Sequence, residues 1–396
     1  MNISLAEKKG VLGNKISKLE VLALVLKYHP CEASVLEASR HFSVEKFIRL
    51  FVTAHGMQPK GIWLTHTYAR YRDSETKLEH FLLIPMPQGN LNDRPNIRFE
   101  GECLFIDNLQ TNIRRQSIPH TTPFWYFHYN PNRENNPYYS MTLNLSPSCI
   151  ERCVLCAGAK TGRVNNGMDD TLSSQSTINK IFRQHPQAAQ QLDSVAIVTG
   201  CFSGFDEMCS HLKEVKQTIS DVSSATTFRV LEHNVVTEEQ FQKVVGELGY
   251  DVFVTLECFD QAIRNIALNG KVGRKGRNSQ EFITILKNYA HYLEARPELG
   301  KHLVRVTYLM GLDSLEITEH FFQEIAAINK QLKHTTILPW LSIFTAYNKA
   351  MKGLQQKDFG LDFLLRGMKL CEKYFDKEML QTLSGGTSDG YARGFY

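Results

Sequence analysis

The stretch MTLNLSPSCIERCVLC, residues 141–156, joins an apolar segment to a group of three cysteines. Residues 141–145 have the length and apolar character of a β-strand. Cys149, Cys153 and Cys156 follow at the spacing CxxxCxxC. The stretch therefore predicts a strand that leads directly into a cysteine-bearing loop.

Apolar runs of strand length recur after this point and alternate with segments of helical periodicity. The predicted strands are residues 141–145, 194–199, 228–231, 251–256, 303–309 and 336–344. The predicted helices are residues 172–183, 206–220, 237–248, 279–294 and 316–332, with Thr237 and Ser279 as capping residues. Strand alternating with helix predicts an α/β protein with a parallel sheet, and six strands predict a partial or full (β/α) barrel.

The first part of the chain has a different pattern. Apolar residues recur at helical spacing in 17–28 and 44–55, and short strand patterns follow at 80–86 and 103–106. Residues 1–115 are therefore expected to form a small α+β N-terminal appendage.

Three further segments complete the predicted organisation. Residues 116–140 are rich in aromatic residues, Pro and Asn, which predicts an ordered linker or the wall of a cavity. The barrel is expected to cover residues 141–345. Residues 346–396 are expected to form a C-terminal tail that is helical and then Gly-rich.

Composition narrows the class of protein. A net charge of +4 over 396 residues is small, so a nucleic-acid partner is not indicated. No stretch approaches the roughly 20 apolar residues that span a bilayer, and the N-terminus lacks the apolar core of a secretory signal. Nine cysteines, three of them crowded together, do not suggest a disulfide framework. These features favour a cytoplasmic protein without a membrane partner.

The cysteine group has the character of a set of metal ligands. Thiolates are the usual ligands of iron–sulfur clusters, and three can hold a [4Fe–4S] cluster whose fourth iron stays open. A structural zinc site would need a fourth Cys or His, and no second CxxC pair supplies one. Because loops at the carboxyl ends of parallel strands carry active sites, we predict a catalytic cluster bound by Cys149, Cys153 and Cys156.

A CxxxCxxC motif directly after the first strand of an α/β barrel resembles the radical S-adenosylmethionine (SAM) superfamily, over residues 140–345. The resemblance implies a radical SAM barrel with two cofactors, the [4Fe–4S] cluster and SAM. In the family, the residue before the last cysteine is usually aromatic and lies against adenine. Leu155 takes that position here, and an aliphatic side chain can still pack on the ring.

The resemblance extends to segments that contact SAM in the family. A second-strand motif binds the SAM amino group through backbone carbonyls, and Thr199, Gly200 and Cys201 match it, with Cys201 in place of an acidic residue. The fifth-strand segment, whose backbone lies near adenine, is matched around Gly311. Cys201 and Cys258 also end strands, so each is either a thiol for radical chemistry or a small hydrophobe in the wall.

Residues 229–264, RVLEHNVVTEEQFQKVVGELGYDVFVTLECFDQAIR, resemble the subgroup that holds tyrosine lyase, tryptophan lyase and the hydrogenase-cofactor maturases. The resemblance implies that Glu257 contacts SAM; the alternative is a carboxylate that stabilises a helix N-terminus. It also implies that an arginine pairs with the SAM carboxylate, with Arg277 preferred and Arg274 as the fallback. A guanidinium suits a carboxylate better than the ammonium of Lys275 does.

The implied activity is reductive cleavage of SAM to a 5′-deoxyadenosyl radical, which abstracts hydrogen from a substrate in a lyase, transferase or isomerase reaction. A flavodoxin- or ferredoxin-type protein would donate the electron. The subgroup favours a small, amino-acid-like substrate. One alternative is a peptide recognised by the N-terminal appendage, and another is a non-catalytic iron–sulfur sensor, which would not require Glu257 and Arg277.

Cys153→Ala should abolish the brown colour of the protein and SAM cleavage together, because two thiolates would be left for the cluster. Visible absorption and bound iron after anaerobic reconstitution measure the loss of the cluster. Detection of 5′-deoxyadenosine measures the loss of SAM cleavage. A Cys153→Ala protein that kept its colour and its cleavage would refute the assignment of this ligand.

Overall fold

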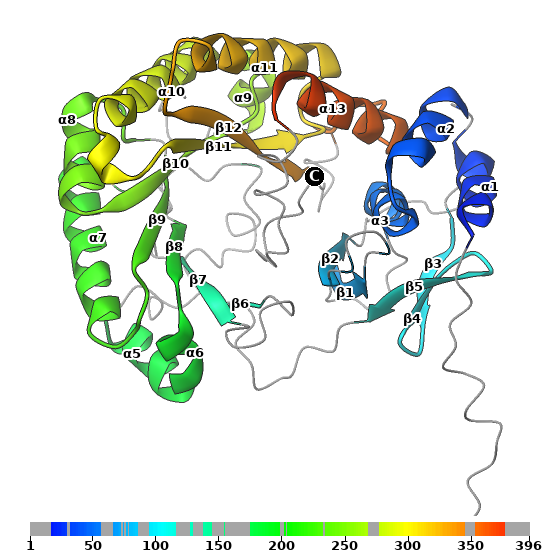
Figure 1. The fold of residues 1–396 in the computed structure, drawn as a ribbon, viewed down its shortest axis with the longest axis horizontal. Coiled ribbons are helices and arrows are strands. Elements are labelled where there is room, and N and C mark those ends of the chain that lie inside the picture. Colours follow the sequence, from blue (N-terminus) through cyan, green and yellow to red (C-terminus); the bar gives the residue numbers. More distant parts are fainter. Residues whose placement is uncertain are drawn as a thin grey trace, which may run out of the picture. The chain divides into compact units, whose positions relative to one another are not determined.

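In the computed structural model, the described residues are 17–29, 32–56, 66–72, 74, 77, 79–85, 95–115, 127–129, 138–144, 154, 175–198, 202, 204–232, 234–267, 277–344 and 353–376. The chain divides into two compact units (Figure 1). The N-terminal unit comprises Met1–Pro119 and Phe359–Arg366, and the C-terminal unit comprises His120–Asp358 and Gly367–Tyr396.

The N-terminal unit combines helices with an antiparallel sheet. Its helices are α1 (Lys18–Tyr28), α2 (Glu32–His41) and α3 (Val44–His55), and its strands are β1 (His66–Arg72), β2 (Glu79–Pro85), β3 (Ile97–Glu100), β4 (Cys103–Ile106) and β5 (Leu109–Arg115). The five strands pair in the order β2-β1-β5-β4-β3. Helix α2 was not predicted, since its sequence EASVLEASRH has few apolar residues to mark a helical face.

The C-terminal unit is built on a seven-stranded sheet. Its strands are β6 (Phe127–Tyr129), β7 (Tyr138–Asn144), β8 (Ser194–Val198), β9 (Thr227–Glu232), β10 (Tyr250–Glu257), β11 (Leu303–Met310) and β12 (Thr336–Ile343). They pair in the order β12-β11-β10-β9-β8-β7-β6. Strands β7 to β12 are parallel, which confirms the predicted six-stranded parallel sheet of an α/β fold.

Strand β6 pairs antiparallel with β7 and lies inside the segment 116–140, where a linker was expected. Its three residues are too few for a period-2 pattern to reveal them. Among the described residues, no strand joins β6 to β12, so the described sheet is open at both edges.

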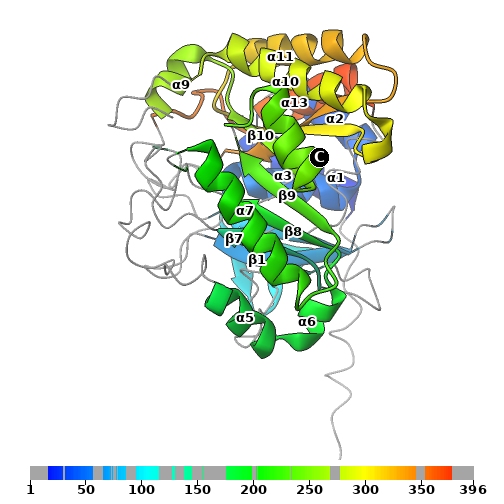
Figure 2. The same ribbon diagram turned by 90° about the vertical axis from the view of Figure 1, so that its left-hand side faces the viewer.

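Helices cover one face of this sheet. They are α5 (Gln175–Gln184), α6 (Pro186–Gln191), α7 (Phe205–Ser220), α8 (Glu238–Phe241), a π-helix (Gln242–Glu247), α9 (Gln261–Ala267), α10 (Ser279–Glu294) and α11 (Leu315–Asn329), and α13 (Leu361–Tyr374) follows β12. Figures 1 and 2 show α7, α8, α10 and α11 along the outer, convex face of the sheet. The helix predicted at 237–248 is thus an α-helical turn that continues as a π-helix.

The two predicted caps have different outcomes. Thr237 caps α8 as expected: its hydroxyl accepts from the Gln240 N–H at 3.3 Å, and the Gln240 side chain accepts from the Thr237 N–H at 3.2 Å. The prediction for Ser279 is wrong, because Asn278 caps α10. Asn278 accepts from the Glu281 N–H at 2.9 Å, and the Glu281 carboxylate accepts from the Asn278 N–H at 2.6 Å. Ser279 is the first helical residue instead.

The two faces of the parallel sheet differ in chemistry. Along β11 buried residues alternate with partly exposed ones, and the buried set faces the helices. The opposite face, here called the concave face, carries Arg229, Thr255, Arg305, Thr307 and Trp340. If apolar layers covered both faces of a parallel sheet, the sequences of its strands would be continuously hydrophobic. The concave face therefore presents polar groups beside apolar ones such as Phe253 and Leu338.

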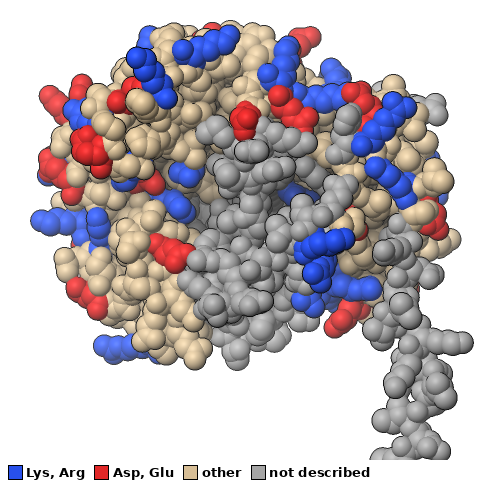
Figure 3. Space-filling view, in the orientation of Figure 1, with Lys and Arg blue, Asp and Glu red and all other residues tan. Residues whose placement is uncertain are grey.

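The outer surface of the C-terminal unit carries charges of both signs. Figure 3 shows acidic and basic side chains interspersed over its helices on the face drawn. Within the described part of the chain, no helix is long and apolar enough to cross a membrane.

Helix α11 is fixed to the sheet by aromatic packing. Phe321 is fully buried, and its ring stacks on that of Tyr308 from β11 with 4.9 Å between centroids. Phe322 packs beside it, at 6.0 Å from Phe321 and at 5.1 Å from Phe375, which directly follows α13. The carboxyl end of β11 thus rests on a buried layer of rings.

Phe321→Ala should lower the free energy of unfolding by about 3–5 kcal/mol, because it leaves a cavity under β11. Val222→Ala, at a position that is 40% exposed, is the matched control and should change stability by less than about 1 kcal/mol. Urea unfolding followed by circular dichroism measures both. Equal effects of the two substitutions would contradict this packing.

Candidate functional site at the carboxyl ends of the strands

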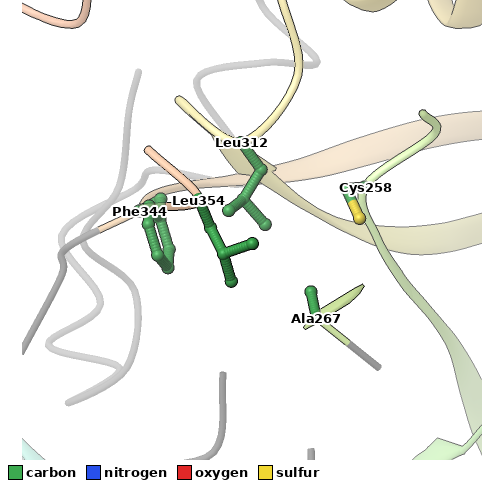
Figure 4. Close-up of a cluster of buried hydrophobic side chains, with 5 residues drawn as sticks. All are labelled: Cys258, Ala267, Leu312, Phe344 and Leu354. Atoms are coloured by element: carbon green, nitrogen blue, oxygen red, sulfur yellow. The ribbon is translucent and has the colours of Figure 1, made fainter. Parts of the chain in front are cut away.

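An apolar cluster lies where β10, β11 and β12 end (Figure 4). Its buried members are Cys258, Ala267, Leu312, Phe344 and Leu354. Each of the three strands contributes the residues that follow its last position, and Ala267 ends α9. Five separate segments thus contribute apolar side chains at the carboxyl ends of these three strands.

One residue of the cysteine motif is described, and it belongs to this edge. Val154 packs against the apolar cluster, and its N–H donates to the carbonyl of Ala267 at 2.8 Å. In the sequence Val154 directly follows Cys153. The contact therefore ties the motif-bearing loop to the end of α9 at this one position.

Cys258 lies inside the cluster. Its side chain is fully buried, and burial raises the pKa of its thiol well above the usual range. A thiol that stays protonated and contacts apolar neighbours behaves as a small hydrophobe. The structure favours that interpretation over a reactive thiol at this position.

Glu257 is the last residue of β10 and has an unusual backbone. Its φ of 68° lies in the left-handed region, and the Cys258 N–H donates to the Leu256 carbonyl at 2.9 Å. A hydrogen bond between residues two apart around a positive φ defines a γ-turn, a rare and strained conformation. The pairing of β10 with β11 also shifts register between Thr255 and Glu257. Such outliers occur preferentially at functional sites.

The Glu257 carboxylate is held by Thr307. The Thr307 hydroxyl donates to Oε1 of Glu257 at 2.9 Å, from the neighbouring strand β11. Burial raises the pKa of Glu257, while the hydrogen bond from Thr307 and the charge of Arg264 act to lower it. Burial is the largest of these effects, so the ionised form is disfavoured unless a ligand supplies further donors or positive charge.

Arg264 lies behind this turn, on α9. It is 4% exposed, and its Nη1 donates to the carbonyls of Leu256 at 2.6 Å and Cys258 at 2.7 Å. Its Nε donates to the carbonyl of Arg277 at 3.3 Å. The guanidinium also lies over the ring of Phe282 at 4.4 Å.

Asp313 holds the next residues of the same segment. Its carboxylate accepts from the N–H groups of Phe259 at 2.5 Å and Asp260 at 3.1 Å, and from the hydroxyl of Tyr308 at 2.6 Å. Asp313 is 1% exposed. Burial raises the pKa of its carboxyl, against the lowering effect of these three donors.

Gly311 directly follows β11, with a φ of 103° that favours glycine. Its carbonyl accepts from the Gln356 N–H at 2.9 Å, and the Gln356 side chain donates to the Leu312 carbonyl at 2.6 Å. Glu257 is the last residue of β10, and Gly311 directly follows the neighbouring strand β11. The two residues therefore lie at the same edge of the sheet.

The predicted site residues are described only in part. Glu257, Gly311 and Arg277 are described, and the backbone carbonyl of Arg277 binds Arg264. The other predicted residues lie outside the described residues: Cys149, Cys153, Leu155, Cys156, Thr199, Gly200, Cys201 and Arg274.

Arg264 and Asp313 are among the residues of the site that were not predicted. The partners of Arg264 are backbone carbonyls, and most partners of Asp313 are backbone amides, so no pattern of residue types marks either. Asp313 stands two residues after Gly311, in the fifth-strand segment that the sequence analysis singled out, and that position was the available signal.

Comparisons with known protein families and with curated proteins find no match. Among solved structures, the chain is similar to the FeFe-hydrogenase maturase HydG from Carboxydothermus hydrogenoformans, with 15% sequence identity and a TM-score of 0.39. The match covers 63% of this chain and 56% of that one, so the chain spans little more than half the length of that protein.

Glu257→Gln should change how stability depends on pH. Because burial raises the folded-state pKa of Glu257 above its usual 4.5, the unfolded chain binds fewer protons than the folded protein at pH values between the two. The free energy of unfolding of the wild type should therefore fall, relative to that of the variant, as pH rises above 4.5. Urea unfolding at a series of pH values measures this difference. A difference that stays constant with pH would contradict the raised pKa.

Proposed function

We propose that the protein is a radical SAM enzyme. The observation that carries the proposal is the position of the CxxxCxxC motif, whose first cysteine, Cys149, comes shortly after β7 ends at Asn144. Strand β7 is the first of the six parallel strands in the chain. Loops after the carboxyl ends of parallel strands are the usual place of active sites in such folds.

The chemistry of the described edge fits the proposed cofactors. Glu257 presents a carboxylate from the end of β10, and Val154 of the motif packs at the ends of β10, β11 and β12. Cys149, Cys153 and Cys156 would hold the [4Fe–4S] cluster, and Glu257 would accept a hydrogen bond from SAM. When bound, the two cofactors would supply a 5′-deoxyadenosyl radical for abstraction of hydrogen from a substrate.

The chain's own residues would bind the cofactors and the substrate, orient them, and exclude water from the site. The Thr307 hydroxyl orients the Glu257 carboxylate, and the apolar cluster around Leu312 and Phe344 keeps the edge dry. A dry site protects a reactive species from water. The concave face, with Thr255 and Arg305 below this edge, offers polar groups to a bound substrate.

We further propose a small, amino-acid-like substrate and a flavodoxin- or ferredoxin-type electron donor. The alternative is a peptide substrate recognised by the N-terminal unit. Transfer of deuterium into 5′-deoxyadenosine from labelled candidates distinguishes the two, since only a true substrate donates its hydrogen.

The decisive experiment uses the full chain after anaerobic reconstitution of the cluster. With dithionite and SAM, mass spectrometry should detect 5′-deoxyadenosine and methionine. Cys156→Ala is the matched control and should release neither, because it lacks one cluster ligand. Absence of 5′-deoxyadenosine from a wild-type preparation with a full [4Fe–4S] complement would overturn the proposal.

A further inference from the structure

The γ-turn at Glu257 coincides with a register shift between β10 and β11. In the register of β10 and β11, Glu257 pairs with Tyr308, whose hydroxyl is buried on the helical side against Thr318 of α11. Paired residues in a regular ladder project to the same face. Glu257 stands two residues after Thr255 and so keeps the concave face, where its carboxylate bonds Thr307. The register shift between Thr255 and Glu257 adds one residue to β10, which is why the backbone of Glu257 pairs with a residue of the opposite face.

The side chains of Arg264 and Asp313 hold the backbone of this turn and of the two residues after it. Nη1 of Arg264 binds the carbonyls on both sides of Glu257, those of Leu256 and Cys258. Asp313 then binds the next two N–H groups, those of Phe259 and Asp260. Both charged groups are at least 96% buried, so water competes little for these bonds.

The supports are themselves anchored. The Arg264 guanidinium lies over the Phe282 ring of α10, with its Cζ 4.4 Å from the ring centroid. The Asp313 carboxylate is held by the Tyr308 hydroxyl at 2.6 Å, which also contacts the Thr318 hydroxyl at 3.0 Å. A strained conformation persists only where its surroundings over-determine it, and this turn meets that condition.

We infer that Arg264 and Asp313 are positioning residues for Glu257: they hold the backbone turn from which its carboxylate is presented beside Thr307 on the concave face. The inference rests on the proposed function, because it assigns Glu257 as a SAM contact. Neither residue is expected to touch SAM. Their effect on SAM binding should therefore vanish when the Glu257 carboxylate is absent.

A double-mutant cycle on the reconstituted full chain tests this. Arg264→Lys, Glu257→Ala and the double variant are compared by anaerobic equilibrium dialysis with labelled SAM. Arg264 uses two nitrogens, Nη1 for the carbonyls around Glu257 and Nε for the carbonyl of Arg277, and a lysine side chain has only one nitrogen. Arg264→Lys should therefore raise the SAM Kd about tenfold. The double variant should bind SAM as Glu257→Ala does. Equal effects of Arg264→Lys in both backgrounds would overturn the inference.

Arg296→Lys is the matched control. Arg296 also lies over an aromatic ring, that of Tyr292 at 4.1 Å, and it pairs with Glu238 at 3.1 Å. Its substitution should leave the SAM Kd unchanged. If Arg264→Lys does not fold, Asp313→Asn replaces it in the same cycle with the same expected outcomes, because the neutral amide weakens the bonds from Phe259 and Asp260.

Hydrogen exchange gives a readout that does not depend on SAM. Backbone amides 258–260 should exchange faster in Arg264→Lys and Asp313→Asn than in the wild type, and unchanged protection would overturn the inference. A wild-type protein with a full cluster that does not bind SAM would overturn the proposed function and the positioning role together. Additive effects in a protein that does bind SAM would overturn the positioning role alone.

Discussion

The carboxylate of Asp313 is buried, and such a group is tolerated in a protein interior only when its oxygens are hydrogen-bonded. Its three donors come from the segment after β10 and from β11 itself, and Tyr308 extends the contact to α11 through Thr318. Satisfying this one charge therefore fixes the relative position of two neighbouring strands and a helix. The geometry around Glu257 depends on that fixed relation.

The six parallel strands could be predicted because each is a short apolar run between segments of helical period. The elements that were missed are short and have little pattern to recognise, such as β6 with its three residues and α9 with its seven. The cap of α10 was displaced by one residue, because Asn278 and Ser279 are both good capping residues and only Asn278 stands three before Glu281. In these segments the residue types allow more than one local structure, and the tertiary contacts of the folded protein determine which one forms.

The sequence predicted where the site lies, at the ends of the parallel strands, but it did not predict which contacts hold its residues in place. Glu257 was expected at the end of a strand, where it lies. Its positive φ could not be predicted from the residue type, since glutamate rarely adopts one. Arg264 was overlooked in favour of Arg274 and Arg277 because its role is toward the backbone. The packing of Val154 against residues more than a hundred positions away is a property of the fold alone.

The contacts of Arg264 to Leu256 and Cys258 have a consequence for how this part of the chain can vary. A carbonyl oxygen is present whatever the side chain, so the turn does not depend on the identity of residues 256 and 258. These positions are restricted by volume and polarity, and exchanges among small or aliphatic residues are compatible with the same turn. The arginine has no equivalent substitute. Variation at residues 256 and 258, with constancy at Glu257, Arg264 and Asp313, is thus the pattern that this architecture permits.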